Sequence, residues 1–181
     1  MLFLFAWTCY YFGNHGWLTV APTLLTEAGY SLATSLNFLI IGNLGLVLGA
    51  ELGFFFTERM GRKLLLQGVL IVWGIALGTI GVVSGASVIV ICGFIAACTI
   101  GLSVPIFYTW TAEQFPVRIQ PSAVASTDGL GHLGGAIAPL VLIPMGFTWG
   151  FLAMRISGIL TAIILIAGRR TRGRSLEQVS G

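Results

Sequence analysis

Hydrophobic residues form long, almost uninterrupted stretches along this chain, and short polar or glycine-containing turns separate the stretches. Each stretch is long enough to supply the ~20 residues that an α-helix needs to cross the apolar core of a bilayer. The pattern predicts an all-α membrane protein with six transmembrane helices, over residues 2–25, 32–56, 64–83, 88–111, 122–145 and 149–168. A basic tail follows at 169–181.

Small residues recur at helical spacing inside these predicted helices, which favours close helix packing in a membrane. The stripes are Gly45, Gly49 and Gly53; Gly74 and Gly78; and Gly93, Ala97 and Gly101. The first predicted helix contains two glycines around Asn14 and His15, so we expect an irregular turn there.

The composition supports a membrane protein and excludes several other classes. Hydrophobic residues make up 56% of the 181 residues and charged residues only 8%, whereas soluble domains carry roughly 25% charged residues. The three cysteines lie in apolar stretches without disulfide or metal-binding spacing, so they predict neither, and no cofactor is expected. The apolar start has no basic leader, which argues against a cleaved signal peptide and suggests a piece of a longer chain.

The basic residues indicate how the predicted helices are oriented. With six crossings, eight of the nine lysines and arginines fall on one side. They are Arg59, Arg62, Lys63, Arg118, Arg169, Arg170, Arg172 and Arg174. The positive-inside rule makes that side cytoplasmic, so both termini are expected there, in a plasma (inner) membrane. The net charge of +3 therefore reflects topology and not nucleic-acid binding. Trp17, Tyr30 and Trp149 then fall at the outer interface.

Residues 53–63 read GFFFTERMGRK and form the densest group of charges between two apolar stretches. The sequence fits a tight cytoplasmic turn in which Gly61 lets the chain reverse, with Glu58 pairing with an arginine or capping the next helix. It resembles the signature loop of the major facilitator superfamily, G-x-x-x-x-(D/E)-R-x-G-R-(R/K), at all positions. The resemblance implies a cytoplasmic motif of Gly53, Glu58, Arg59, Gly61, Arg62 and Lys63.

Three further segments resemble the C-terminal half of such carriers. Residues 108–118, YTWTAEQFPVR, are similar to the loop between their tenth and eleventh helices, which adds Glu113 and Arg118 to the cytoplasmic motif. The glycine-rich segment 129–139 resembles the eleventh helix of the same proteins, and GRSLEQ at 173–178 resembles the tail after their last helix. Residues 11–17, YFGNHGW, look more like small-organic-acid and vitamin carriers than sugar porters.

The resemblance implies helices seven to twelve of a secondary carrier that moves a small polar organic solute by alternating access, with protons as the expected coupling ion. Its expected partners are the bilayer and the missing N-terminal half. An alternative stays open: a truncated or partner-dependent membrane protein without transport activity alone. A reading frame for six more helices upstream of Met1 would favour the carrier.

Asp128 and His132 are the strongest candidates for the solute and proton pathway. They lie four residues apart on one helical face and could hydrogen-bond. At 1.5 Å per residue they lie about 9 and 15 Å into their predicted helix. Ionisable groups at this depth are costly and usually functional, and an imidazole beside a carboxylate suits a proton relay. A buried pair that only fixes helix packing is the alternative.

Several other polar residues could contribute, each with a structural alternative. Glu51 could couple protons, although an intracellular gate or orientation pair with Arg59 or Arg118 is favoured. Arg155 could attract an anion, although an outer-leaflet anchor is favoured. The remaining candidates for the solute pathway are Asn14, His15, Tyr11, Tyr108 and Trp110, for which packing roles are equally possible.

Two patterns suggest chemistry that the rest of the sequence does not support. Residues 129–134 match the dinucleotide-binding glycine spacing, but no strand precedes them, so close helix packing is the better interpretation. Ser103 lies in GLSVP, which lacks the second glycine of a nucleophile elbow, so an intramembrane serine protease is disfavoured. No enzyme activity is therefore expected.

Overall fold

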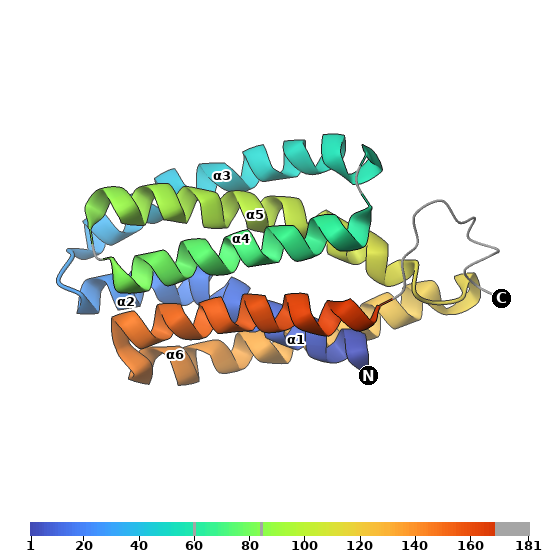
Figure 1. Ribbon diagram of the computed structural model, residues 1–181. Helices are drawn as coiled ribbons and strands as arrows, with labels where there is room; N and C mark the ends of the chain where they lie inside the picture. The colour runs from blue at the N-terminus through green and yellow to red at the C-terminus, as the bar shows by residue number, and fades with distance from the viewer. Residues whose placement is uncertain (60, 84, 169–181) are drawn as a thin grey trace.

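The computed structural model describes residues 1–59, 61–83 and 85–168, and these residues form helices joined by short connections. The main helices are α1 (Leu2–His15), α2 (Ala21–Glu27), α3 (Leu32–Arg59), α4 (Arg62–Val82), α5 (Ala86–Ala112) and α6 (Gln120–Ile164). They lie side by side along one long axis (Figure 1). The predicted basic tail lies outside the described residues. An all-helical fold is thereby confirmed for the part of the chain that the structure describes.

Four helical segments of this part of the chain are long and apolar enough to cross a membrane: Leu32–Thr57, Arg62–Val82, Ala86–Ala112 and Val117–Ala167. Helical residues occupy all six predicted ranges. The number of crossings depends on two places where the helices are not simple rods, the first predicted range and the long α6. The six-crossing count therefore stays a prediction.

The first predicted range is helical but interrupted. After α1 ends at His15, Gly16–Val20 form a π-helix, η1, and α2 continues from Ala21. Pro22 in the first turn of α2 has no N–H to donate to the preceding turn, which favours a wider turn before it. The irregular turn expected near Asn14 and His15 is thus confirmed as a π-helical segment immediately after them.

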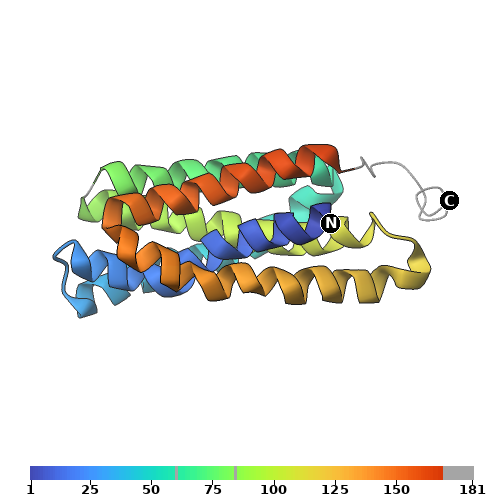
Figure 2. The same ribbon diagram turned by 90° about the horizontal axis from the view of Figure 1, so that it is seen from below.

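The long α6 reverses direction at Gly146, which has φ 72° and ψ −177°. This backbone conformation is essentially restricted to glycine because a Cβ atom would clash. Figures 1 and 2 show the orange ribbon turning back into the red one at this point. We refer to residues 120–145 as the first arm of α6 and to residues 147–164 as its second arm.

The glycine stripe of α3 brings its backbone against that of α5, as predicted. A Cβ atom on Gly45 would lie 2.3 Å from the carbonyl oxygen of Phe94, and one on Gly49 would lie 1.9 Å from that of Cys98. From the other side, a Cβ atom on Gly101 would lie 2.2 Å from the carbonyl oxygen of Leu46. Real Cβ atoms do not approach this closely, so the two helices can touch only because these side chains are absent.

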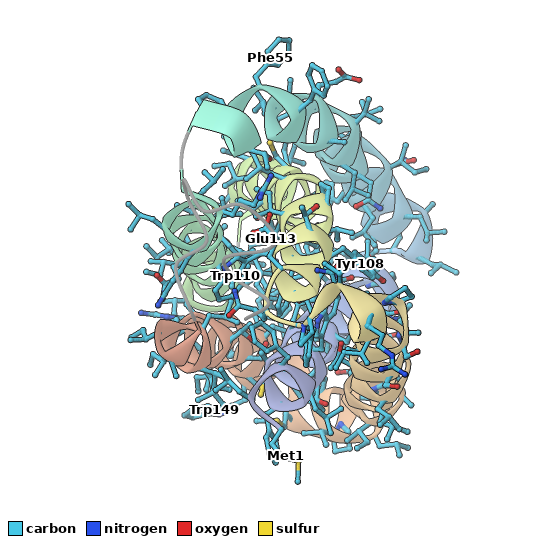
Figure 3. All side chains as sticks on the ribbon, turned by 90° about the vertical axis from the view of Figure 1, so that its right-hand side faces the viewer. Met1, Phe55, Tyr108, Trp110, Glu113 and Trp149 are labelled. Atoms are coloured by element: carbon cyan, nitrogen blue, oxygen red, sulfur yellow. The ribbon has the colours of Figure 1, made fainter. Side chains whose placement is uncertain are left out.

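On its other side, α5 packs against α1 through large aromatic side chains. The rings of Trp7 and Phe107 stack with centroids 4.1 Å apart, and Tyr10 meets Phe107 edge to face at 5.5 Å. Figure 3, a view along the bundle, shows α5 between α3 and α1, with α4 and the second arm of α6 on one flank. Tyr108, on α5, lies against α1 and the first arm of α6.

One predicted interfacial residue lies in the core instead. Trp17 is only 1% exposed, and its ring fills the space that a Cβ atom on Gly93 would occupy. The prediction that Trp17 lies in the outer aromatic belt is therefore wrong, because the glycine on α5 opens a place for the indole inside the bundle. Trp149, in contrast, is 65% exposed.

Candidate functional site

Three helices meet at the carboxylate of Asp128, on the first arm of α6. The hydroxyl of Tyr108, from α5, donates to Asp128 Oδ1 at 2.5 Å, and the hydroxyl of Tyr11, from α1, donates to the same oxygen. The two hydroxyl oxygens are 3.0 Å apart. We call Asp128, Tyr11, Tyr108, His132 and His15 the Asp128 cluster.

The imidazole rings of both histidines lie close to the ring of Tyr11. The rings of His132 and Tyr11 have centroids 3.9 Å apart, and His15 meets His132 edge to face at 5.7 Å. The side chain of His132 is 47% exposed and that of Asp128 is 25% exposed. Part of the Asp128 cluster is therefore accessible from outside the helix bundle.

The predicted pair of Asp128 and His132 shares one face, but its hydrogen bond differs from the one expected. His132 Nδ1 lies 2.9 Å from the backbone carbonyl oxygen of Asp128 and 3.7 Å from the carboxylate oxygen Oδ1. A distance of 3.7 Å is too long for a hydrogen bond. The imidazole is thus held by the backbone, while the phenols hold the carboxylate.

Glycines on the first arm of α6 allow this arrangement because they let α1 approach closely. A Cβ atom on Gly131 would lie 2.7 Å from the Cβ atom of Trp7, and one on Gly134 would lie 2.0 Å from the carbonyl oxygen of Thr8. The interpretation of the 129–134 glycine spacing as a packing motif is confirmed at these two positions. Gly129, where nothing lies within 4 Å, does not take part.

Two other predicted pathway residues are not in the Asp128 cluster. Trp110 is fully buried and packs against Phe3 with ring centroids 5.4 Å apart. Asn14 is 5% exposed and lies one residue from His15, which does reach the cluster. Of the predicted pathway residues, the structure therefore brings together Asp128, His132, His15, Tyr11 and Tyr108.

The predicted cytoplasmic motif residues meet where α4 begins and α5 ends. Arg62 forms an ion pair with Glu113, whose side chain is 13% exposed. The Nζ atom of Lys63 donates to the carbonyl oxygens of Ile166, at 2.5 Å, and Gly168, at 2.7 Å. These carbonyls belong to a helix C-terminus, where a cation is favoured. The two segments that resemble carrier loops, 53–63 and 108–118, are therefore in direct contact.

The other members of this motif are less directly connected. Gly53 is buried beside Leu102 and Pro105, and the side chains of Glu58 and Arg59 lie outside the described residues. Glu51 and Arg118 are exposed on α3 and after α5. Gly61 has φ −61° and ψ 121°, which any residue can adopt. The expectation that glycine is needed there for chain reversal is therefore wrong.

Arg155 lies on the second arm of α6 against the glycines of α4. A Cβ atom on Gly78 would lie 2.4 Å from Arg155 Cδ. Its side chain therefore follows the α4 surface and does not extend toward the Asp128 cluster, which involves the first arm of α6. An anchoring role is consistent with this packing.

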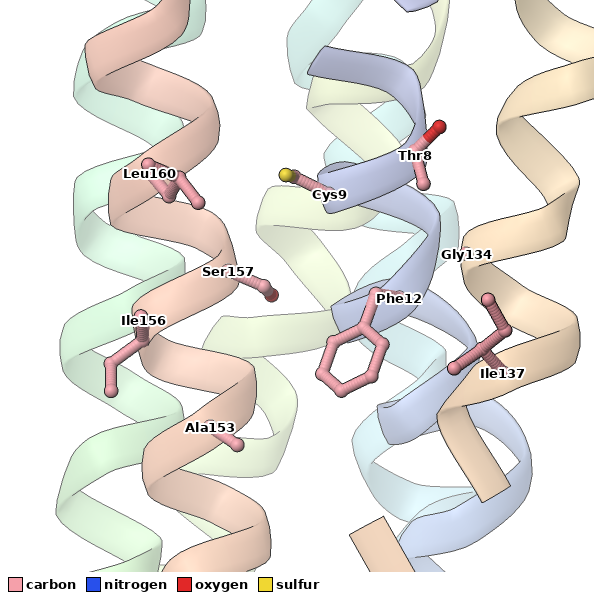
Figure 4. Close-up of a pocket in the computed structure, with 9 residues that line it drawn as sticks. All are labelled: Thr8, Cys9, Phe12, Gly134, Ile137, Ala153, Ile156, Ser157 and Leu160. Carbon is pink, nitrogen blue, oxygen red and sulfur yellow. The ribbon is translucent and has the colours of Figure 1, made fainter. Parts of the chain in front are cut away.

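An apolar groove of about 360 Å³ lies between α1 and both arms of α6. Its lining includes Phe12, Ile137 and Ile156, and Figure 4 shows the ring of Phe12 between the two arms. The hydroxyls that border it are already bonded, Thr8 to the carbonyl oxygen of Leu4 and Ser157 to that of Met154. The lining of the groove therefore lacks free hydroxyl groups that could bind a polar solute.

Sequence reasoning did not find that Tyr108 and Tyr11 bind one carboxylate oxygen. The two tyrosines are 97 residues apart, so only the packing of α1 against α5 brings them together. It also missed the bond between the hydroxyls of Tyr10 and Ser103, at 2.9 Å. No group of His, Cys, Asp and Glu suited to a metal ion occurs among the described residues.

No family model matches the chain, but individual transporters do. A niacin transporter of Acinetobacter baylyi is 29% identical over 99% of the chain, and a benzoate transport protein of the same bacterium is 27% identical over 89%. An organic cation transporter of Drosophila melanogaster is 34% identical over 73%. Over most of its length, the chain is similar to transporters of the major facilitator type.

This relationship covers only part of each relative. The chain spans 42% of the length of the niacin transporter, 35% of the benzoate transport protein and 24% of the organic cation transporter. It is thus consistent with one half of such a transporter. Transporter relatives and apolar helices together indicate a multi-pass integral membrane protein related to transporters and not to enzymes.

Proposed function

We propose that this chain is the C-terminal, six-crossing half of a secondary carrier for a small organic solute. The reversal of α6 at Gly146 would supply two crossings from one long helical segment. The helical run from Leu2 to Glu27, with its π-helix, would supply another. With α3, α4 and α5, the total is six. The similarity to transporters over almost the whole chain supports this proposal.

The proposed orientation in the membrane is supported by the motif contacts and by the positive-inside rule. Arg62 and Lys63 lie at the end of the bundle where α5 ends, and Arg62 pairs with Glu113, the residue after α5. Under the positive-inside rule this end is cytoplasmic, and both termini lie there. We propose that this membrane is the plasma (inner) membrane and that the ion pair of Arg62 and Glu113 joins the two cytoplasmic loops of this half.

The single observation that carries the transport proposal is the Asp128 cluster. A carboxylate and two imidazoles inside apolar helices are expensive in a bilayer, and such groups mark solute and ion pathways. Asp128 is the proposed proton site. His132 and His15 present ring nitrogens next to the face of Tyr11, which suits a small aromatic acid. The niacin and benzoate transporters among the relatives support this class of solute.

A cavity for a solute needs a second wall. In the proposed mechanism, this half rocks against an N-terminal half around the Asp128 cluster, and the proton and the solute reach it alternately from each side. Because the chain spans less than half of its relatives, we expect no transport from it alone. Such a partner-dependent membrane protein is the second candidate function.

The test combines the chain with the part of the Acinetobacter baylyi niacin transporter that it does not match. Proteoliposomes with an inward proton gradient are given labelled nicotinate, benzoate or glucose. We expect uptake of an aromatic acid, at least tenfold weaker in Asp128→Asn. Glu27→Gln, the same change at an exposed carboxylate on α2, serves as the control and should leave uptake unchanged. Insertion without uptake of any of these solutes would contradict the proposal.

A further inference from the structure

Two helices hold one oxygen of Asp128 and leave the other oxygen available. Tyr11 from α1 and Tyr108 from α5 both donate to Oδ1. Among the described residues, none donates a hydrogen bond to Oδ2, and the side chain is 25% exposed. The carboxylate is therefore held through Oδ1, and Oδ2 has no hydrogen-bond donor among the described residues.

The two hydrogen bonds that join α1 and α5 to α6 depend on the charge of this carboxylate. Hydrogen bonds to an ionised group are roughly twice as strong as those between neutral groups. In a surrounding of low polarity this difference is large, because water does not replace the lost interaction. A proton on Oδ2 would remove the negative charge that both phenols face, so both bonds would weaken at the same time.

The groups around Asp128 leave few other ways to neutralise it. From α1 the titratable groups are Tyr11 and, behind it, His15; from α5 it is Tyr108; and on α6 it is His132. Within the described residues, His132 is its only ion-pair partner, at 3.7 Å. Neither an arginine nor a lysine of the described residues pairs with it, so protonation is what changes the charge of this carboxylate.

The packing around the Asp128 cluster shows which helices these two hydrogen bonds hold together. The first arm of α6 lies closely against α1 at Gly131 and Gly134, while α5 has few contacts with α6 as a whole. The bond from Tyr108 to Asp128 is thus a main polar connection between α5 and the first arm of α6. Loss of this bond would loosen the first arm of α6 from α5, while the stacked rings of Trp7 and Phe107 would keep α1 against α5.

We propose that Tyr11 and Tyr108 are positioning residues that make the packing of α1, α5 and α6 depend on the protonation of Asp128. A proton from water on one side binds Oδ2, the phenol bonds to Oδ1 weaken, and the helices can shift. Release of the proton to the other side restores the bonds. This inference rests on the proposed proton site at Asp128, and it assigns the coupling of proton and helix movement to the two phenols.

The test measures the carboxylic-acid C=O stretching band of the purified full chain in lipid, by infrared difference spectroscopy across a pH series. This measurement needs no transport. The band that disappears in Asp128→Asn reports protonation of Asp128. In Tyr11→Phe and in Tyr108→Phe, we expect the pH at which this band is half-developed to rise by about one unit, because a donor that favours the ionised form is lost. The double variant should rise further.

Tyr10→Phe is the matched control. Tyr10 is the neighbour of Tyr11 on α1, but its hydroxyl bonds Ser103 and not Asp128, so the band should not move. An unchanged band in the folded double variant would overturn the role of the phenols. If Asp128→Asn removes no band, the proposed proton site itself fails. A pH shift of the same size in Tyr10→Phe would also overturn the inference, because the effect would then be unspecific.

Discussion

The two sides of α5 pack in opposite ways. Toward α3, backbone meets backbone, and the stripe of Gly45 and Gly49 leaves no room for a side chain. Toward α1, large rings separate the two helices, and hydroxyl and indole groups bond across the contact, as Trp7 does with Thr111 at 3.2 Å. One helix therefore carries a contact of small residues on one side and a contact of polar aromatic residues on the other.

The difference shows how a membrane protein can separate stability from movement. In lipid, the hydrophobic effect does not drive helices together, so close approach through small residues provides dispersion contacts that depend strictly on distance. Hydrogen bonds between side chains can break and form again while the rings stay in contact. We therefore expect α3 and α5 to move as one body and the contact of α5 with α1 and α6 to rearrange.

The largest effect is expected for Gly49→Ala. The new Cβ atom would overlap the carbonyl oxygen of Cys98, so α3 must move away from α5. We expect a loss of about 3 kcal/mol of unfolding free energy, at the upper end of overpacking. Titration of the purified chain from mild detergent into SDS, followed by circular dichroism, measures it. Gly68→Ala on α4, where nothing lies within 4 Å, is the control and should be close to neutral.

A smaller effect is expected on the aromatic side of α5. Tyr10→Phe removes the bond to Ser103 but keeps the ring contact with Phe107. Hydrogen bonds between membrane helices contribute about 0.6 kcal/mol on average, and we expect a loss of this size in the same titration. The double variant with Ser103→Ala should lose little more than either single one. A loss as large as that of Gly49→Ala would remove the distinction between the two sides.

The smallest effect is expected for Gly61→Ala, a glycine outside both interfaces. Its φ and ψ are those of ordinary extended backbone, so an alanine needs no strained conformation. We expect a change below about 0.5 kcal/mol, as for most surface substitutions. A drop in stability comparable with that of Gly49→Ala would mean that the turn after α3 needs glycine for packing.

Much of the fold follows from the pattern of apolar stretches, because a bilayer forces backbone polar groups into helices. The break after His15 was predictable from the two glycines around Asn14 and His15. The reversal near residue 146 was predictable because one apolar stretch ends at 145 and the next begins at 149. The role of Gly61 was misjudged and that of Gly146 was missed, because residue type alone does not reveal which glycine has a positive φ.

The candidate site was predictable only in part. Asp128 and His132 stand out because ionisable residues are rare in apolar stretches. Their partners do not stand out, since tyrosines are common at membrane interfaces and in cores. That Tyr11 and Tyr108 bind the same oxygen depends on how α1, α5 and α6 pack, and spacing along the chain contains no information about this. Trp17 illustrates the same limit, because the place for its ring is made by a glycine on another helix.

The tight reversal at Gly146 has a consequence for how this protein enters the membrane. Because the first and second arms of α6 are joined by almost no loop, the insertion machinery receives them as one helical hairpin. Asp128 and His132 make the first arm a poor substrate for insertion by itself, since a charged side chain near the centre of a helix costs about 3 kcal/mol on the biological scale. The apolar second arm comes immediately after it and can draw its polar neighbour into the lipid during synthesis.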